Sequence, residues 1–148
     1  MREDSPGTTR RAPWHLWVVA TVGLLWNAVG VVDHFMTQAK NESYMGRLTP
    51  EQLEILYSLP KWLVAFWTLA VWGGAVGAVL LLLRKRLAAP VLLASLLAMM
   101  ATGIHNFLSA NGLYRTGGTS PAFVLVIFLM ALGLWLYARA MSGRGALT

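Results

Sequence analysis

Five polar side chains stand inside long apolar runs or at their ends, where a polar site in a hydrophobic protein has to be built. They are Asn27, Asp33, His34, His105 and Asn106. Ionisable groups at membrane depth are costly to bury, so they mark candidate functional residues. A histidine beside a carboxylate is suited to relaying protons or holding a polar solute. We therefore predict that these five residues form one small substrate-binding site.

The depth of each residue also allows a structural interpretation. A helix from Trp14 to Asp33 rises about 29 Å, so Asp33 and His34 come close to the far membrane interface, where water satisfies them. His105, about 27 Å beyond the start of its own apolar run, reaches almost the same depth. Asn27 lies about 20 Å in and has to find a hydrogen-bond partner within the protein. The five residues thus either form a substrate-binding site or have a structural role, in which they cap helix ends and hold helices together.

Catalytic and metal chemistry have little support in the sequence. The chain has no cysteine, which excludes disulfides, thiolate metal sites and a cysteine nucleophile. Asp33, His34 and His105 offer no close ligand pair at helical spacing, so we expect no metal. No serine–histidine or paired-carboxylate arrangement is visible either. We predict that the protein is not an enzyme and that it carries no cofactor.

The composition indicates a membrane protein. Of the 148 residues, 57% are hydrophobic and only 12% are charged, against about 25% charged in ordinary soluble domains. The apolar residues are gathered into four blocks, each near the roughly 20 residues that cross a bilayer as a helix. We predict an all-α chain forming a four-helix transmembrane bundle. The expected spans are about 13–36, 61–83, 87–109 and 121–139, within one domain at 13–141 and between tails at 1–12 and 142–148.

A short helix is expected in the loop after the first span. Thr49, Pro50 and Gln52 form a helix start, with a threonine cap, a proline in the first turn and glutamine three residues after the cap. Apolar residues then alternate with Glu51 and Glu54. We predict a surface helix at about 50–58, lying on the membrane and stopped by Pro60.

The distribution of basic residues predicts the orientation. Eight lysines and arginines fall on one side of the predicted spans and four on the other, so both termini are expected in the cytoplasm and the surface helix outside. The larger set is Arg2, Arg10, Arg11, Arg84, Lys85, Arg86, Arg139 and Arg144, and the smaller is Lys40, Arg47, Lys61 and Arg115. Because these charges cluster at the ends of apolar runs, the expected partner is the lipid bilayer rather than a nucleic acid.

Small residues predict where helices pack closely. Gly23 and Gly30 share a face with Asn27, and Gly73, Gly74 and Gly77 line the second span. We expect the Asn27 face to meet the third span, with His34 and His105 in one layer. Because four helices enclose little space, a transporter of this size would require a homo-oligomer, for which the glycines of the second span are a candidate interface.

Several strings resemble a group of small bacterial membrane proteins. These strings are W-N-A-V-G-V-V-D-H-F-M-T-Q, N-E-S-Y, T-P-E-Q and P-K-W-L-V-A-F-W-T-L-A-V-W-G-G. Members have four spans and this length, and are often given the name "sugar transporter". The resemblance implies a bacterial inner-membrane location and solute transport, and transfers no functional residues. Our leading hypothesis is transport of a small polar solute; the alternative is a structural or accessory membrane protein with no substrate.

Overall fold

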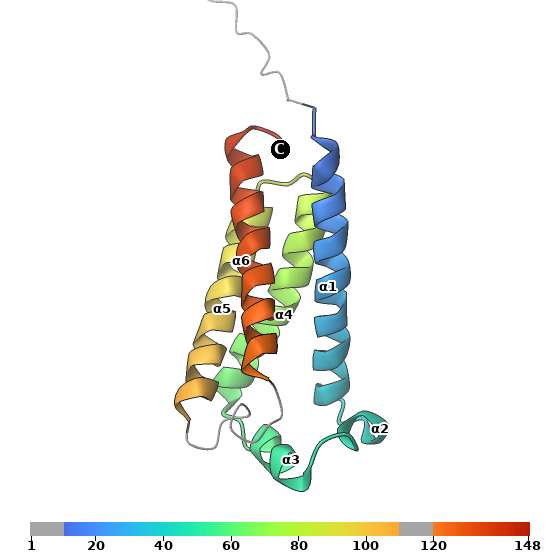
Figure 1. Cartoon of the computed structure of the whole chain (residues 1–148), viewed down its shortest axis with the longest axis vertical. Coiled ribbons are helices and arrows are strands. Elements are labelled where there is room, and N and C mark those ends of the chain that lie inside the picture. The colour runs from blue at the N-terminus through green and yellow to red at the C-terminus, as the bar shows by residue number, and fades with distance from the viewer. Residues whose placement is uncertain (1–10, 110–119) are drawn as a thin grey trace, which may run out of the picture.

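The computed structural model describes residues 11–109 and 120–148, and within them the regular structure is entirely helical (Figure 1). The predicted all-α fold with four apolar helices long enough to cross a membrane is confirmed. At 21 to 25 residues they are about 32–38 Å long. The long helices are α1 (Trp14–Gln38), α4 (Lys61–Leu82), α5 (Ala88–Leu108) and α6 (Pro121–Gly143), and the short ones are α2 (Glu42–Met45) and α3 (Pro50–Tyr57).

Helix α3 begins as the sequence predicts. The Thr49 hydroxyl accepts a hydrogen bond from the Gln52 backbone N–H at 3.3 Å, and the Gln52 side chain accepts one from the Thr49 N–H at 3.1 Å. This reciprocal pair is a capping box, and Pro50 occupies the first turn, where its missing N–H costs nothing. The helix ends at Tyr57, three residues before Pro60.

The four long helices lie side by side, with α2 and α3 at one end (Figure 1). We call this the loop end, and the opposite end, which holds the turn 84–86 between α4 and α5, the turn end. Helix α4 packs most extensively against α5 and α1, and α5 packs against α6. Helices α1 and α6 touch less, through Gly23 against Leu134 and through His15, whose ring accepts or donates a short hydrogen bond at the Tyr137 hydroxyl.

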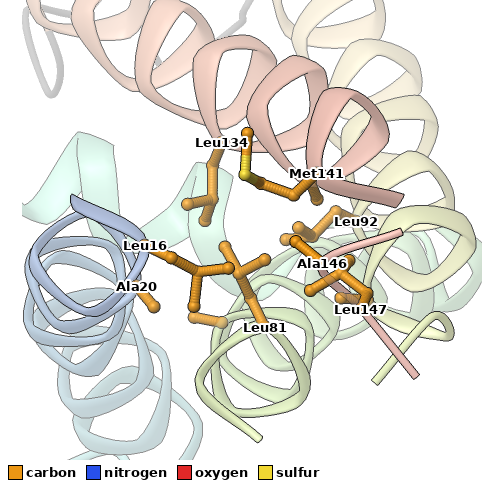
Figure 2. Packing of buried hydrophobic residues seen from close by; sticks show 11 residues of the cluster. Leu16, Ala20, Leu81, Leu92, Leu134, Met141, Ala146 and Leu147 are labelled. Atoms are coloured by element: carbon orange, nitrogen blue, oxygen red, sulfur yellow. The ribbon is translucent and has the colours of Figure 1, made fainter. Parts of the chain in front are cut away.

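The buried apolar core is concentrated at the turn end (Figure 2). It takes residues from all four long helices and from the segment 144–148: Leu16, Ala20, Ala78, Leu81, Ala88, Leu92, Leu134, Ala138, Met141, Ala146 and Leu147. The structure describes residues 142–148, which the sequence predicts as a cytoplasmic tail. Helix α6 continues to Gly143, and the segment beyond it turns back onto the helices.

Large apolar side chains cover the outside of the long helices. Val29, Phe107 and Leu108 are each at least 70% exposed. Of the most apolar stretch of each long helix, only 11% to 28% is buried within the protein. Soluble monomers rarely expose apolar patches beyond a few hundred Å². The exposed apolar surface is therefore the surface that lipid covers in an integral membrane protein.

Candidate functional site

Asn27 is packed between helices. Its side-chain amide donates to the Gly23 carbonyl at 2.7 Å, and its Oδ1 lies against Gly74 of α4. A Cβ at Gly74 would overlap Oδ1 and lie 3.1 Å from the Asn27 Cγ. The expectation that this face of α1 meets the third span, α5, is wrong. It meets α4, because Gly74 presents bare backbone at the depth of Asn27.

Helix α5 adds a polar contact on another side of the same turn of α4. The Ser95 hydroxyl donates to the Ala70 carbonyl at 2.5 Å, and a Cβ at Gly74 would be 3.4 Å from the Ser95 oxygen. Gly74 thus lies between a polar residue of α1 and a polar residue of α5. These contacts hold three helices together at mid-depth, which is a packing role for Asn27.

The remaining glycines differ in what they contact. A Cβ at Gly77 would be 2.5 Å from the Leu92 side chain, one at Gly73 would be 3.1 Å from Ser95 Cβ, and one at Gly23 would be 2.8 Å from Leu134. At Gly30 the nearest side-chain atom, on Val71, is 3.9 Å away, an ordinary contact. Gly73, Gly74 and Gly77 thus contact side chains of α1 and α5 within the chain, which is the helix-packing role predicted for them.

His34 is buried against α4 near the loop end, with 6% of its surface exposed. The Thr68 hydroxyl donates to the Val64 carbonyl at 2.8 Å, so the Thr68 oxygen accepts from His34 Nε2, 3.0 Å away. The His34 ring also meets the Trp67 ring edge-on, with centroids 4.8 Å apart. His34 therefore fixes the start of α4, and the position of Trp67 in particular, relative to α1.

Asp33 points elsewhere, although it is the neighbour of His34 in the sequence. Its side chain is exposed, and its carboxylate accepts a short hydrogen bond from the Tyr44 hydroxyl of α2. Tyr44 in turn lies on the first turn of α2, whose start is capped by the Asn41 side chain. Asp33 thus fastens the loop to the end of α1.

This bond gives a pH-dependent signal. The hydrogen bond to Asp33, followed by partial burial, raises the pKa of Tyr44 above its ordinary value of 10.0. The stability that the Tyr44–Asp33 hydrogen bond contributes is therefore complete below about pH 10. It is lost as the pH rises through the raised pKa of Tyr44. We expect Asp33→Asn to lower the pKa of Tyr44, measured by ultraviolet titration of phenolate absorbance. The same change in a Tyr44→Phe background should leave the titration unchanged; superimposable curves for wild type and Asp33→Asn would contradict the bond.

His105 and Asn106 lie at the end of α5, on a different side of α4 from His34. The His105 ring meets the Trp62 ring edge-on with centroids 5.2 Å apart, whereas His34 contacts Trp67 and Thr68. His105 and Asn106 line a cavity of about 160 Å³, which we call the α5 cavity. Its other lining residues are Ile55, Ser58, Leu59, Pro60 and Ser109. The two histidines therefore do not share a site.

A second cavity, which we call the α1 cavity, lies between the end of α1, α3 and the start of α4. It measures about 140 Å³ and is lined by Thr37, Gln38, Lys40, Leu56, Tyr57, Leu59, Val64 and Trp67. None of the five predicted site residues lines it. Leu59 lines both cavities, so the end of α3 and the residues after it divide the loop end in two.

The sequence signals for the α1 cavity were indirect. Lys40 and Tyr57 belong to the loop, and the Lys40 ammonium lies 4.7 Å above the Tyr57 ring. The apolar side of α3 and the tryptophans of α4 can be recognised in the sequence. That they line one cavity together with Gln38 of α1 is seen only in the folded structure. Among residues 11–109 and 120–148, no three His, Cys, Asp or Glu side chains gather as a metal ion would need.

The five predicted residues thus occupy three places: Asn27 between α1 and α4, Asp33 and His34 at the end of α1, and His105 and Asn106 beside the α5 cavity. In the described part of the chain, every buried side-chain nitrogen and oxygen has a hydrogen-bond partner. Comparisons with models of protein families, with curated proteins and with solved structures give no match for this chain.

Proposed function

We propose that this protein is an integral membrane protein that binds a small polar solute in the α1 cavity, as one step in moving that solute across the membrane. The observation that carries the proposal is the cavity itself, where two aromatic rings and three polar side chains converge at the loop end. Ligand sites are typically concave surfaces with apolar and aromatic walls and a few convergent polar groups.

The size of the α1 cavity restricts the solute. It measures about 140 Å³, well below the roughly 300–1,000 Å³ of sites for drug-sized ligands. A cavity of about 150 Å³ in another protein binds benzene, so one six-membered ring fits. The six-membered ring of a monosaccharide, without its hydroxyl groups, has that size, and the resemblance to proteins called sugar transporters supports the same class.

The lining groups suit a solute with one apolar face and a polar rim. The Tyr57 and Trp67 rings offer flat apolar surface, and the Gln38 amide both donates and accepts hydrogen bonds. Lys40 adds a cation with three donors. Thr37 already donates its hydroxyl to the Asp33 carbonyl at 2.8 Å, so toward a solute its oxygen only accepts.

The alternative is a structural or accessory membrane protein without a substrate. It is favoured by one observation, that three of the five predicted polar residues are hydrogen-bonded within the chain. Asn27 bonds Gly23, His34 bonds Thr68, and Asp33 bonds Tyr44. These bonds suffice to explain why such residues occur in or near apolar helices, with no solute present.

Location and assembly belong to the same proposal. The resemblance and the excess of basic residues at the turn end support a bacterial inner membrane with the turn end in the cytoplasm. The loop end, with both cavities, then faces outward. A homo-oligomer would have to form through the lipid-facing surfaces of the long helices, since the glycines of α4 are covered by α1 and α5.

The test is binding and uptake of monosaccharides by purified, reconstituted protein. We expect Trp67→Leu and Lys40→Ala each to weaken binding at least about tenfold, as truncation of a central contact does. Trp72→Leu is the matched control for Trp67, because Trp72 is 45% exposed on the outside of α4. His105→Leu tests the α5 cavity and should leave binding unchanged. If wild-type protein neither binds nor takes up any solute of this size, the accessory alternative is favoured.

A further inference from the structure

Charged side chains are distributed unequally between the two ends of the helices. In the part of the chain that the structure describes, the turn end carries six lysines and arginines and no aspartate or glutamate. The loop end carries three basic residues and four acidic ones. The residues of the turn end are Arg11, Arg84, Lys85, Arg86, Arg139 and Arg144, and those of the loop end are Asp33, Lys40, Glu42, Arg47, Glu51, Glu54 and Lys61. The turn end is therefore strongly positive, whereas the loop end is close to neutral.

Hydrogen bonds bring the cations of the turn 84–86 beside those of α6. Arg84 Nε donates to the Ala146 carbonyl at 3.0 Å, and Arg86 Nε donates to the Leu147 carbonyl at 3.2 Å. Both carbonyls follow directly on Arg144 at the end of α6. The two groups of cations, far apart in the sequence, thus lie together at one end of the molecule. We call Lys85, Arg86, Arg139 and Arg144 the basic surface.

Three of these four cations have no carboxylate to balance them. Lys85, Arg139 and Arg144 are exposed, and their side chains make no hydrogen bond or ion pair within residues 11–109 and 120–148. The Arg139 guanidinium lies 5.6 Å above the centroid of the Trp135 ring. Stacking of this kind uses the flat face of the guanidinium and leaves the N–H donors at its edge available. Like charges gathered in this way repel one another, and a bound anion relieves that repulsion.

The basic surface lies at the level expected for lipid headgroups. From Pro121 to Arg139, α6 rises about 27 Å, close to the roughly 30 Å thickness of the hydrocarbon core. Trp135 of α6 and Trp14, which is 76% exposed at the start of α1, lie at the same end, and tryptophan is enriched at membrane interfaces. Only 11% of the most apolar stretch of α6 is buried within the protein. Cations and exposed apolar surface therefore adjoin each other on one helix, which suits an anion that carries acyl chains.

We propose that the basic surface binds anionic phospholipids, whose phosphate groups pair with Lys85, Arg139 and Arg144 while their acyl chains cover the apolar outside of α6. Guanidinium groups bond phosphate through two parallel N–H donors. Attraction to anionic lipid is worth about fivefold in affinity for each lysine or arginine near the membrane surface. The inference does not rest on the proposed function, because the α1 cavity lies at the opposite end of the helices.

The test is the binding of single phospholipids to the purified full chain in detergent, followed by native mass spectrometry. Phosphatidylglycerol and phosphatidylcholine with the same acyl chains differ in the charge of the headgroup. We expect the wild type to bind phosphatidylglycerol at least about tenfold more tightly, as two or more cations near the headgroup provide. Glycerol phosphate, which has an anionic headgroup and no acyl chain, should not displace the lipid at equal concentration. Equal affinity for the two lipids would overturn the proposal, and displacement by glycerol phosphate would make the surface a site for soluble anions instead.

Matched variants locate the binding on the basic surface. Arg139→Gln/Arg144→Gln should lower the affinity for phosphatidylglycerol at least about tenfold and leave that for phosphatidylcholine unchanged, which also shows that the variant is folded. Arg139→Lys/Arg144→Lys keeps both charges and should retain most of the preference. Arg47→Gln/Lys61→Gln removes the same charge from two exposed positions at the loop end and should retain all of it.

The comparison of the two glutamine variants is decisive. If both weaken binding of phosphatidylglycerol equally, the lipid responds to the net charge of the protein, and the assignment to the basic surface is wrong. Solute binding in the α1 cavity takes no part in this measurement. Failure of the lipid preference therefore leaves the proposed function standing, and failure of solute uptake leaves the lipid preference standing.

Discussion

Replacing Gly74 with alanine is expected to destabilise the protein by about 1–3 kcal/mol, the usual cost of inserting a methyl group into a filled core. The new Cβ would overlap Asn27 Oδ1 and stand 3.1 Å from its Cγ. The side chain of Asn27 cannot simply swing away, because its amide donates to the Gly23 carbonyl. Thermal or denaturant unfolding in detergent micelles measures the change.

Two matched variants isolate the cause. Gly133→Ala, in α6, meets no atom within 4 Å and should be neutral or stabilise by about 0.5–1 kcal/mol, because alanine is the better helix former. In an Asn27→Ala background the Gly74→Ala penalty should largely disappear, which gives a coupling energy between the two sites. Additive losses in the double variant would show that Asn27 does not pack on Gly74.

The spans follow from the sequence because apolar length is a local property. The second was expected at 61–83 and is Lys61–Leu82, and the third at 87–109 and is Ala88–Leu108. Helix α6 runs on to Gly143, beyond the expected 139, since Ala138 and Met141 continue its buried side. That side is recognisable only once the core at the turn end is known.

The partner of Asn27 could not be predicted in the same way. The spacing of Gly23, Asn27 and Gly30 shows that they share one helix face. However, any neighbouring span with a small residue at the depth of Asn27 could pack against that face. Gly74 of α4 supplies that residue, and Ser95 of α5 occupies the next position around α4. The choice is made by the fit of three helices together, which a pattern within one helix does not contain.

The α1 cavity, in which we propose the site, lies at the same end of the helices as four of the five predicted residues, but none of the five lines it. Polar side chains in apolar runs attract attention, yet His34 and Asn27 are bonded inside the protein. The α1 cavity is lined instead by residues such as Lys40 and Trp67, which are unremarkable where they stand in the sequence.

Single-cysteine labelling should give an all-or-none result for membrane topology. Ser43 is exposed at the loop end and Lys85 at the turn end, and one long helix, α4, lies between them in the chain. Leu69 is 49% exposed midway along α4, so the protein itself does not shield this position from a labelling reagent. In a membrane, the surrounding lipid would shield it. The absence of native cysteine means that each variant reports one position.

The most direct test of the account is therefore to treat intact cells with a membrane-impermeant maleimide, before and after permeabilisation. We predict labelling of Ser43→Cys in intact cells, labelling of Lys85→Cys only after permeabilisation, and no labelling of Leu69→Cys in either. The reverse pattern for Ser43 and Lys85 would keep the spans and overturn the orientation. Labelling of Leu69→Cys as rapid as that of Ser43→Cys, or labelling of Ser43→Cys and Lys85→Cys from the same side, would contradict the four-span membrane protein itself.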